Sequence, residues 1–447
     1  MSEAKTPHRL SIIAAFCLAF GAHAADDDLL SRDALFGDDP TKASVAPRET
    51  GPGLKGFIQF EAARTSASPE HWSKLRTRAE LGSSGKLGEG LKWKLGARFD
   101  YDFAYGINDY YPPEVRQNQR TNIELRENYL DYSAGNWEFR FGKQHVVWGE
   151  MVGLFFADVV SARDMREFVL PEFDQMRIPQ WAARAEYFGE SIHAELLWIP
   201  VASYDNIGKP GAEFYPMPQG TNIRYLPEQR PERNADNMNY GLRLSTLQNG
   251  WDVSGFYYRS SDINQTFYRT ALTPTTIEYQ ARHDRINQWG GTVSKDFGDI
   301  VFKAEAVYTA GRSFTTLDLT DPNGVVRQNT LDWAAGLDFT LPAETRFNAQ
   351  LFQRQYLEHN RGIIPDRQEN GYSLLINNKF RQDWEAQAIF ISSLNRTDWL
   401  LRPRLAWNFE RNWRLLLGAD IFKGPPTGLF GRYDHQDRVY SEVRYSF

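Results

Sequence analysis

The carboxy-terminal strand is the feature that most constrains what this chain can fold into. Alternate residues of an extended strand point to opposite faces. One face of residues 438–447 carries Val439, Ser441, Val443, Tyr445 and Phe447, and the other carries Arg438, Tyr440, Glu442, Arg444 and Ser446. The first face suits lipid and the second suits water. This ending favours the closing strand of a membrane β-barrel, with Tyr445 and Phe447 as its assembly signal, over an amphipathic strand of a soluble sheet.

The amino-terminal residues predict export. Two basic residues, Lys5 and Arg9, precede an apolar run at 10–20 that is followed by small residues. This pattern predicts a secretory signal peptide over residues 1–24. The only cysteine of the chain lies inside it, so no disulfide is expected in the mature protein. Residues 25–52 are rich in Asp and Pro and poor in residues that build a core, and we expect a flexible periplasmic segment there.

The composition excludes a helical membrane protein. Mean hydropathy is -0.55, and no later run approaches the roughly 20 apolar residues that a spanning helix needs. Yet 14% of the residues are aromatic, far more than the core of such a polar chain requires. A transmembrane barrel explains both values, because only alternate residues face lipid and aromatic girdles line its interfaces. The formal net charge of -6 argues against nucleic acid as a partner.

Residues 53–447 are predicted to form one all-β domain. Extended segments with alternating polarity follow one another, and residues 91–103 show the pattern most clearly, with an apolar side chain at every odd position. The expected strands are 54–64, 73–82, 90–104, 121–133, 136–146, 180–189, 191–200, 237–247, 250–260, 283–297, 300–311, 328–341, 344–357, 370–381, 383–395, 397–410, 411–423 and 435–447. This gives about eighteen strands, with sixteen as the alternative.

The connections between these strands alternate in length. Tight turns recur at every second position, as at 134–136 and 248–250, and the connections between them are mostly long, as at 105–120 and 201–236. The pattern predicts a transmembrane antiparallel up-and-down β-barrel with short periplasmic turns and long extracellular loops. Its expected location is the outer membrane of a Gram-negative bacterium. Outer-membrane lipid, lipopolysaccharide and the outer-membrane assembly machinery are its expected partners there.

One loop, at residues 147–179, departs from the alternation. Residues 158–170 have helical spacing and Pro171 ends them, so a helix is expected there. We expect this loop to fold inward and narrow the lumen, because a wide barrel is not filled by the side chains of its strands. An extracellular loop with a solvated helix is the alternative. The charged residues proposed for the constriction are Glu150, Asp158, Arg163, Asp164, Arg166 and Glu167.

The strand pattern also places charged residues on the inner wall. The lumen-facing positions proposed to contribute to the pore are Arg76, Arg78, Arg98, Glu124, Arg126 and Arg140. Further arginines near the end of the chain point the same way, namely Arg402, Arg404, Arg414, Arg438 and Arg444. Two interpretations stay open: a basic path that favours anions or anionic amphiphiles, or charges paired across strands in a wet lumen.

Several motifs around the inward loop carry a resemblance to a known family. They are Leu125-Arg126-Glu127-Asn128-Tyr129-Leu130-Asp131-Tyr132, Phe141-Gly142-Lys143-Gln144-His145-Val146-Val147-Trp148-Gly149-Glu150, Asp158-Val159-Val160, Phe168-Val169-Leu170-Pro171 and Arg177-Ile178-Pro179-Gln180-Trp181. In them the chain resembles the proteobacterial outer-membrane family labelled domain of unknown function 1302. The resemblance implies a β-barrel whose genes often accompany efflux-type exporters and periplasmic lipid-handling proteins, which are the partners it suggests.

No local pattern indicates catalysis. The sequence has no Gly-x-Ser-x-Gly and no His-Glu-x-x-His, so we predict no enzyme, no catalytic residue, no metal and no cofactor. The expected function is a porin-like outer-membrane channel for small solutes or lipid-like amphiphiles, as a candidate outer-membrane partner of an export system. A barrel-borne lipid hydrolase and a plugged barrel that acts in docking or recognition are the alternatives.

Overall fold

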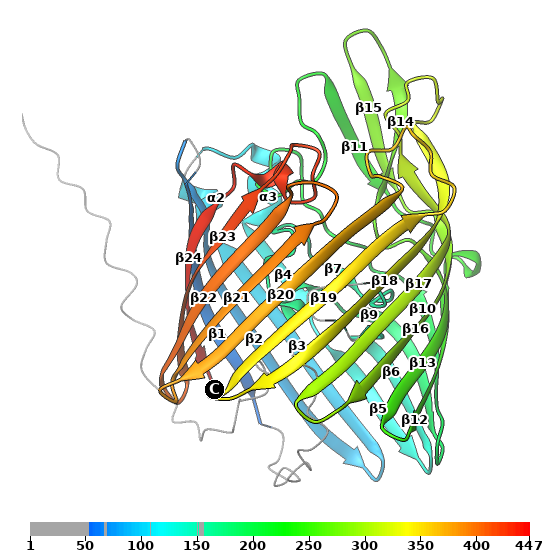
Figure 1. The fold of residues 1–447 in the computed structure, drawn as a ribbon, viewed down its shortest axis with the longest axis vertical. Helices are drawn as coiled ribbons and strands as arrows, with labels where there is room; N and C mark the ends of the chain where they lie inside the picture. The colour runs from blue at the N-terminus through cyan, green and yellow to red at the C-terminus, as the bar shows by residue number, and fades with distance from the viewer. Residues whose placement is uncertain (1–52, 67–68, 108, 150, 152–155) are drawn as a thin grey trace, which may run out of the picture.

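The chain forms a closed antiparallel β-barrel (Figure 1). The computed structural model describes residues 53–66, 69–107, 109–149, 151 and 156–447. The expected signal peptide and periplasmic segment, at 1–24 and 25–52, lie outside these residues.

The wall consists of strands that follow one another around the barrel in chain order. The first are β1 (Lys55–Thr65), β2 (Trp72–Gly88), β3 (Leu91–Asp102), β4 (Thr121–Leu125), β5 (Asn128–Ala134), β6 (Trp137–Gln144), β9 (Gln180–Phe188), β10 (His193–Val201), β12 (Asn239–Gln248) and β13 (Trp251–Ser261). The others are β16 (Arg285–Asp296), β17 (Ile300–Thr315), β18 (Val325–Leu341), β19 (Thr345–Tyr356), β20 (Gln368–Phe380), β21 (Trp384–Ser393), β22 (Trp399–Glu410), β23 (Trp413–Lys423) and β24 (Arg438–Ser446).

β4 and β5 both pair with β3 and share one place in the wall, so the strands fill eighteen positions. This confirms the predicted strand number and excludes sixteen.

The first and last strands close the barrel. β1 pairs with β2 on one side and with β24 on the other. The terminal residue takes part, because Gly56 N donates to Phe447 O (3.0 Å) and Phe447 N donates to Gly56 O (2.9 Å). Closure leaves no unpaired strand edge facing hydrocarbon, where unsatisfied backbone groups cost several kcal/mol each.

The two faces of the wall differ as the alternation predicts. In β1, Ile58 and Phe60 are 50% and 44% exposed on the outside, whereas Gln59 and Glu61 between and beside them are buried in the interior. The polar side chains of the wall therefore face the lumen, and the apolar ones face the surroundings of the barrel.

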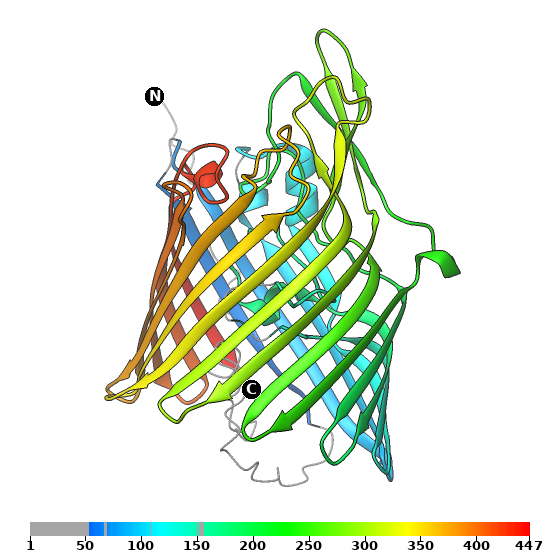
Figure 2. The ribbon, with the colours of Figure 1, turned by 45° about the vertical axis from the view of Figure 1, so that its right-hand side comes forward.

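The connections also follow the prediction, with short turns on one rim and long loops on the other (Figures 1 and 2). The turn between β12 and β13 is Asn249-Gly250, and both residues have positive φ (53° and 73°). This conformation matches the twist of a two-residue hairpin and suits Asn and Gly. The carboxy terminus lies at the short-turn rim (Figure 1).

An aromatic belt runs along the short-turn rim from β20 to the carboxy terminus. Its rings lie in successive contact in the order Phe380, Trp384, Trp407, Phe409, Trp413, Tyr445 and Phe447. Aromatic side chains are enriched at membrane–water interfaces, because the ring is apolar and its polar group can be hydrated. Tyr445 and Phe447, the expected assembly signal, thus complete both the closing strand and this belt.

The remaining elements belong to the long loops. β11 (Ile223–Gln229), β14 (Thr266–Leu272) and β15 (Ile277–Arg282) form a three-stranded sheet that rises beyond the barrel (Figure 2). Short helices occur at α2 (Ala104–Ile107), α3 (Pro113–Gln119), α4 (Phe173–Met176), η1 (Ala235–Asn237) and η2 (Gly431–Tyr433). No helix in the described part of the chain is long and apolar enough to cross a membrane.

The closing pair yields the first prediction. Deleting residues 445–447 removes the partners of Gly56, Phe57 and Ile58 and the last two rings of the belt, so we expect little folded barrel in the outer membrane. The measurement is the heat-dependent shift of the folded band in gel electrophoresis. As a control, deleting residues 274–275 at the tip of the β14–β15 hairpin should leave the shift intact. Normal amounts of the shifted band in the terminal deletion would contradict this role of β24.

Candidate functional site

The candidate site is the long segment between β6 and β9, which enters the barrel. Gln144 and Gln180 stand opposite each other at the ends of these two paired strands, so a tight turn would have been enough to connect them. Instead the described residues of the segment 147–178 lie inside the lumen and contact its wall on several sides.

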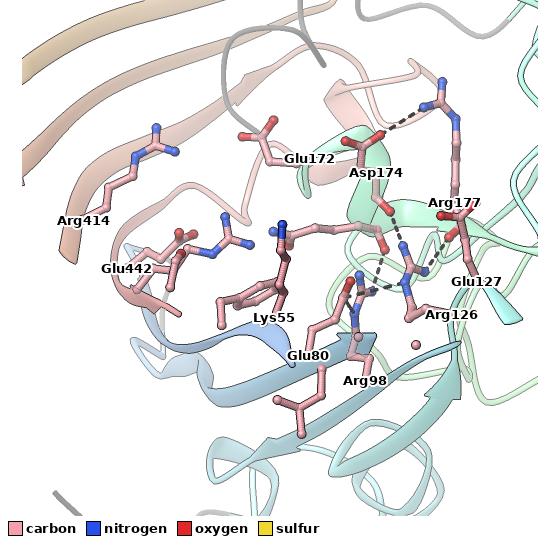
Figure 3. Close-up of a pocket in the computed structure, with 18 of the residues that line it drawn as sticks. Lys55, Glu80, Arg98, Arg126, Glu127, Glu172, Asp174, Arg177, Arg414 and Glu442 are labelled. Atoms are coloured by element: carbon pink, nitrogen blue, oxygen red, sulfur yellow. Dashed lines mark hydrogen bonds and ion pairs between the residues drawn. The ribbon is translucent and has the colours of Figure 1, made fainter. Parts of the chain in front are cut away.

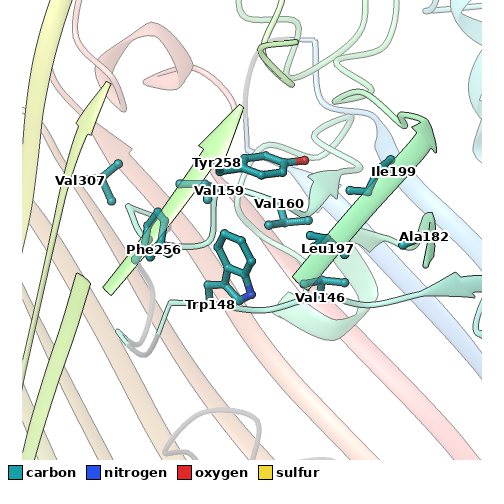
Figure 4. Close-up of a cluster of buried hydrophobic side chains, with 11 residues drawn as sticks. Val146, Trp148, Val159, Val160, Ala182, Leu197, Ile199, Phe256, Tyr258 and Val307 are labelled. Carbon is teal, nitrogen blue, oxygen red and sulfur yellow. The ribbon is translucent and has the colours of Figure 1, made fainter. Parts of the chain in front are cut away.

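An apolar cluster fixes the start of the segment to one wall (Figure 4). Trp148, Val159 and Val160 pack on lumen-facing side chains of β9, β10, β13 and β17. Trp148 is only 1% exposed, and its Nε1 donates to Glu195 Oε1 (3.2 Å). Gly241 of β12 makes room for the indole ring, since a Cβ at this position would lie 2.6 Å from it. A hydrophobic core thus forms inside the barrel.

The middle of the segment folds differently from the sequence prediction. Residues 158–170 contain no helix; Ala162–Arg163 form β7, which pairs with β8 (Arg177–Ile178). The helix of this segment, α4, follows Pro171 rather than preceding it. Tertiary contacts outweigh local propensity here: Arg163 N donates to the buried Asp205 Oδ1 (2.7 Å) of the next long loop, a partner that spacing along the segment does not reveal.

Arginines of the opposite wall hold the far side of the segment. Arg76 Nη1 lies 2.6 Å from Glu167 Oε1. The other wall contacts are Arg438 with Glu167, Arg404 with Glu172, Arg78 with Gln175 Oε1, Arg98 with Gln175 O, Arg126 with the carbonyls of Asp174 and Arg177, and Arg402 with Leu170 O. Three of these arginines, Arg98, Arg126 and Arg402, donate to backbone carbonyls of the segment, so they act through the backbone as well as through charge.

A second apolar cluster packs the segment against the last strands and the loops above them. Phe168 and Leu170 contact Leu400, Phe422 and Phe430 of β22, β23 and the loop after β23. Phe168 adopts a positive φ of 54°, which is unusual for an aromatic residue. In this conformation the ring of Phe168 packs on the ring of Tyr433, with the two centroids 4.9 Å apart.

The inner wall is largely paired. Arg78 binds Asp100 (2.6 Å), Arg98 binds Glu80 (2.8 Å), Arg126 binds Glu124 (3.2 Å), Arg140 binds Asp131 (2.6 Å), and both Arg402 and Arg438 bind Asp420 (2.8 Å each). Of the two interpretations left open by the sequence, pairing across strands thus describes most of these arginines.

The structure does not bring all the predicted site residues together. Arg76, Arg78, Arg98 and Arg126 contact the crossing segment, and Glu124 lies beside them. Arg140 pairs with Asp131 in the wall, with no contact to the segment among its described interactions. Within the segment Asp158 pairs with Arg177 (3.0 Å), Asp164 pairs with Arg166 (2.5 Å), and Arg163 donates to Asp158 O. Glu167 is the predicted acid that meets the wall, and Glu150 lies outside the described residues.

A break in the wall adds a contact that sequence reasoning missed. Between β4 and β5, Arg126 and Glu127 leave the strand ladder, and Arg126 N donates to Gly96 O (2.9 Å). Such an irregularity lets two consecutive side chains reach the same space. Both line the lumen cavity, and Glu127 accepts a bond from Lys94 Nζ (2.5 Å).

Two cavities flank the segment inside the barrel. The larger, of about 560 Å³, lies on the short-turn side and is bounded by Glu172, Asp174 and Gln175 of the segment (Figure 3). The smaller, of about 440 Å³, lies on the long-loop side, bounded by Phe156, Asp158 and Phe168. The segment therefore separates two spaces that face opposite rims.

Opposing charges keep two acids of the segment, Glu167 and Glu172, ionised. Burial opposes the ionisation of Glu172, but Arg404, with Arg402 and Arg414 nearby, lowers the pKa of its carboxyl to about 2. Arg76 and Lys74 likewise hold the pKa of the buried Glu167 well below its usual range. Glu167 and Glu172 are therefore ionised at neutral pH.

One arrangement bears on the hydrolase alternative. Ser245 Oγ lies 3.3 Å from His193 Nδ1, and His193 Nε2 lies 3.2 Å from Glu186 Oε1. Glu186 is also bound by Arg184 (2.8 Å), and neither of the two cavities reaches Ser245. In the described part of the chain, no group of three or more His, Cys, Asp or Glu side chains is placed to hold a metal ion.

Comparisons with known proteins identify the family. Residues 70–447 match the family model described as "Protein of unknown function (DUF1302)". The chain belongs to this family. No curated protein matches it.

Solved structures resemble the barrel over most of its length. OccAB2 of Acinetobacter baumannii is 9% identical, with a TM-score of 0.53, over 89% of this chain and 98% of that chain. OmpT, an outer membrane protein of Vibrio cholerae, is 10% identical (89% and 100% covered, TM-score 0.45), and Salmonella typhi OmpF, in a complex with daunomycin, is 10% identical (89% and 97%, 0.44). The likeness to OccAB2 shows the fold of this family member, an outer-membrane type of β-barrel.

The apolar cluster yields the second prediction. Trp148→Ala should lower the free energy of unfolding by about 3–5 kcal/mol, the usual cost of truncating a buried aromatic residue to alanine. Trp148→Phe, which keeps most of the ring and loses the bond to Glu195, should cost clearly less. Denaturant unfolding of the detergent-solubilised barrel measures both values. Equal stability of the alanine variant and the unchanged protein would show that this cluster does not support the barrel.

The Glu172–Arg404 pair yields the third prediction. Because the folded-state pKa of Glu172 lies below its ordinary value of 4.5, its contribution to stability is present above pH 4.5 and is lost as the pH falls toward 2. The difference in unfolding free energy between the unchanged protein and Glu172→Gln should therefore be constant from pH 7 to 4.5 and shrink below it. A difference that does not change down to pH 2 would mean that Arg404 does not act on this carboxyl.

Proposed function

We propose that this protein is an outer-membrane channel for small anionic or lipid-like amphipathic solutes, in which residues 147–178 act as the filter. The observation that carries the proposal is the placement of this segment between two cavities, each on the side of a different rim. A molecule that crosses the lumen has to pass it. The segment is attached to both walls, by packing on one side and by arginines on the other.

The chemistry of the two cavities supports amphipathic cargo. Apolar side chains bound much of the smaller one, including Phe156, Val159, Ile263, Phe314 and Phe352. Charged side chains of both signs bound the larger one. Mixed walls of this kind accept molecules that carry an apolar part and a polar group.

The location and the partners belong to the same proposal. The aromatic belt and the apolar outer face support insertion into the outer membrane of a Gram-negative bacterium, in contact with its lipid and lipopolysaccharide. In this role the barrel would be the outer-membrane partner of an efflux-type exporter and of periplasmic lipid-handling proteins. The larger cavity, on the side of the short turns, is the space that would receive material from the periplasm.

Removing the segment tests the proposal. Because Gln144 and Gln180 already stand opposite each other, a short Gly-Ser linker in place of residues 147–178 closes the hairpin without altering the strands. We expect conductance in planar bilayers to rise severalfold, because the widest obstruction of the lumen is removed.

The control is a barrel shortened only at 274–275, outside the lumen, which should conduct like the unchanged protein. Equal conductance of the segment deletion and the unchanged protein would refute the filter. If both barrels fold but neither conducts, the channel itself is refuted and the recognition role becomes the better hypothesis.

A further inference from the structure

We propose that the larger cavity contains a binding site for the carboxylate or phosphate head group of an amphiphile, formed by Arg414 and Arg444. The proposal deepens the proposed function, on which it rests for the view that this cavity belongs to a route for solutes. It adds a ligand class and the residues that select it.

The two arginines stand directly opposite each other on β23 and β24, and both line the cavity. Like charges in direct cross-strand opposition destabilise a sheet unless something offsets them. Most wall arginines around them have acidic partners, as described above. Within the residues that the structure describes, neither Arg414 nor Arg444 has an ion pair within 4.0 Å, and the Nε of each is buried without a hydrogen-bond partner.

Apart from Glu442, the carboxylates that line this cavity have other partners. Glu172 forms an ion pair with Arg404, Glu80 with Arg98, and Glu127 with Lys94. Asp174 pairs with Arg177, and Glu385 accepts a bond from Asn377. Glu442 is the remaining carboxylate: it lies two residues before Arg444 in β24, on the same face, and has no ion pair within 4.0 Å among the described residues. Lys55 adds a third positive charge.

Figure 3 shows this division of the cavity. Glu80, Arg98, Arg126, Asp174 and Arg177 form a connected network on one side of it. Arg414 and Glu442 lie on the other side, apart from this network. Two guanidinium groups with free donors match the geometry of a carboxylate or phosphate, which accepts paired hydrogen bonds.

Apolar surface adjoins the pair on both sides. The guanidinium carbon of Arg444 lies 3.6 Å from the centroid of the Phe57 ring. Next to Arg414 on the lumen face lies Leu416, whose cross-strand neighbour is Ala406. A bound anion would thus have apolar side chains beside it, which favours an anion with an apolar tail over an inorganic ion.

Calorimetric titration of the folded barrel in a non-ionic detergent tests the site, with octanoate as the probe. We expect octanoate to bind, acetate to bind at least tenfold more weakly, and uncharged octanol to bind as weakly as acetate. The double variant Arg414→Gln/Arg444→Gln should lose at least tenfold in octanoate affinity. The double variant Arg414→Lys/Arg444→Lys should lie between, because it keeps the charge and loses the paired donors.

Two further variants distinguish a loss of octanoate binding at this site from a loss of folded barrel. Glu442→Gln should strengthen octanoate binding, because it removes the carboxylate that competes for the arginines; a merely weakened barrel would not bind more tightly. The matched control Arg381→Gln/Arg411→Gln removes the same charge from turns on the same rim and should leave the affinity unchanged. Heat-shifted electrophoresis confirms that each variant is folded.

The results separate the two proposals. Absence of octanoate binding to the unchanged protein, equal binding by the Arg414/Arg444 variant, or equal affinity for acetate and octanoate would overturn the site, whatever the conductance shows. Octanoate binding that depends on the two arginines, in a barrel that does not conduct, would support the site and refute the channel.

Discussion

Backbone hydrogen bonding in hydrocarbon is the constraint on which the rest of this structure depends. A sheet in a membrane has to close, because an open edge would leave a row of donors and acceptors unpaired. Closure at eighteen positions produces a lumen wider than the side chains of the wall can fill. The segment between β6 and β9 occupies this wide lumen. It gives the interior an apolar core and separates the lumen into two cavities.

The interior is held by two kinds of interaction on opposite walls. Around Trp148 the segment is packed like the core of a soluble domain. On the other side arginines reach its carbonyls and carboxylates. Burying charges is costly, and removing one partner of a buried ion pair costs more than the intact pair contributes to stability. The arginines therefore fix the position of the segment rather than adding much to the stability of the barrel. Packing would carry the larger share of the stability.

The sequence predicted the features that arise from local periodicity. Alternation along single strands located the wall, its lumen-facing arginines and the closing strand, because a period of two sets the face of each residue. The helix expected at 158–170 was wrong, since its spacing reflects contacts with several strands and loops rather than one helical face. Other features depend on residues that are far apart in the chain. They are the acceptors Gln175 and Asp205, which bind Arg78 and the backbone of Arg163, the space that Gly241 leaves for Trp148, and the break in the strand ladder at Arg126. Local patterns contain no such information.

The aromatic belt has a consequence for the depth of the arginine pair. Trp413 and Tyr445, two members of the belt, are themselves cross-strand partners, and Arg414 and Arg444 are the next residues inward on the same two strands. Girdle rings outside and guanidinium groups inside therefore occupy adjacent levels of one wall. An amphiphile held by this pair would keep its head group level with those of the inner leaflet and its tail level with their acyl chains. Its exchange with that leaflet around the short-turn rim would then move no charge to the hydrocarbon centre of the bilayer.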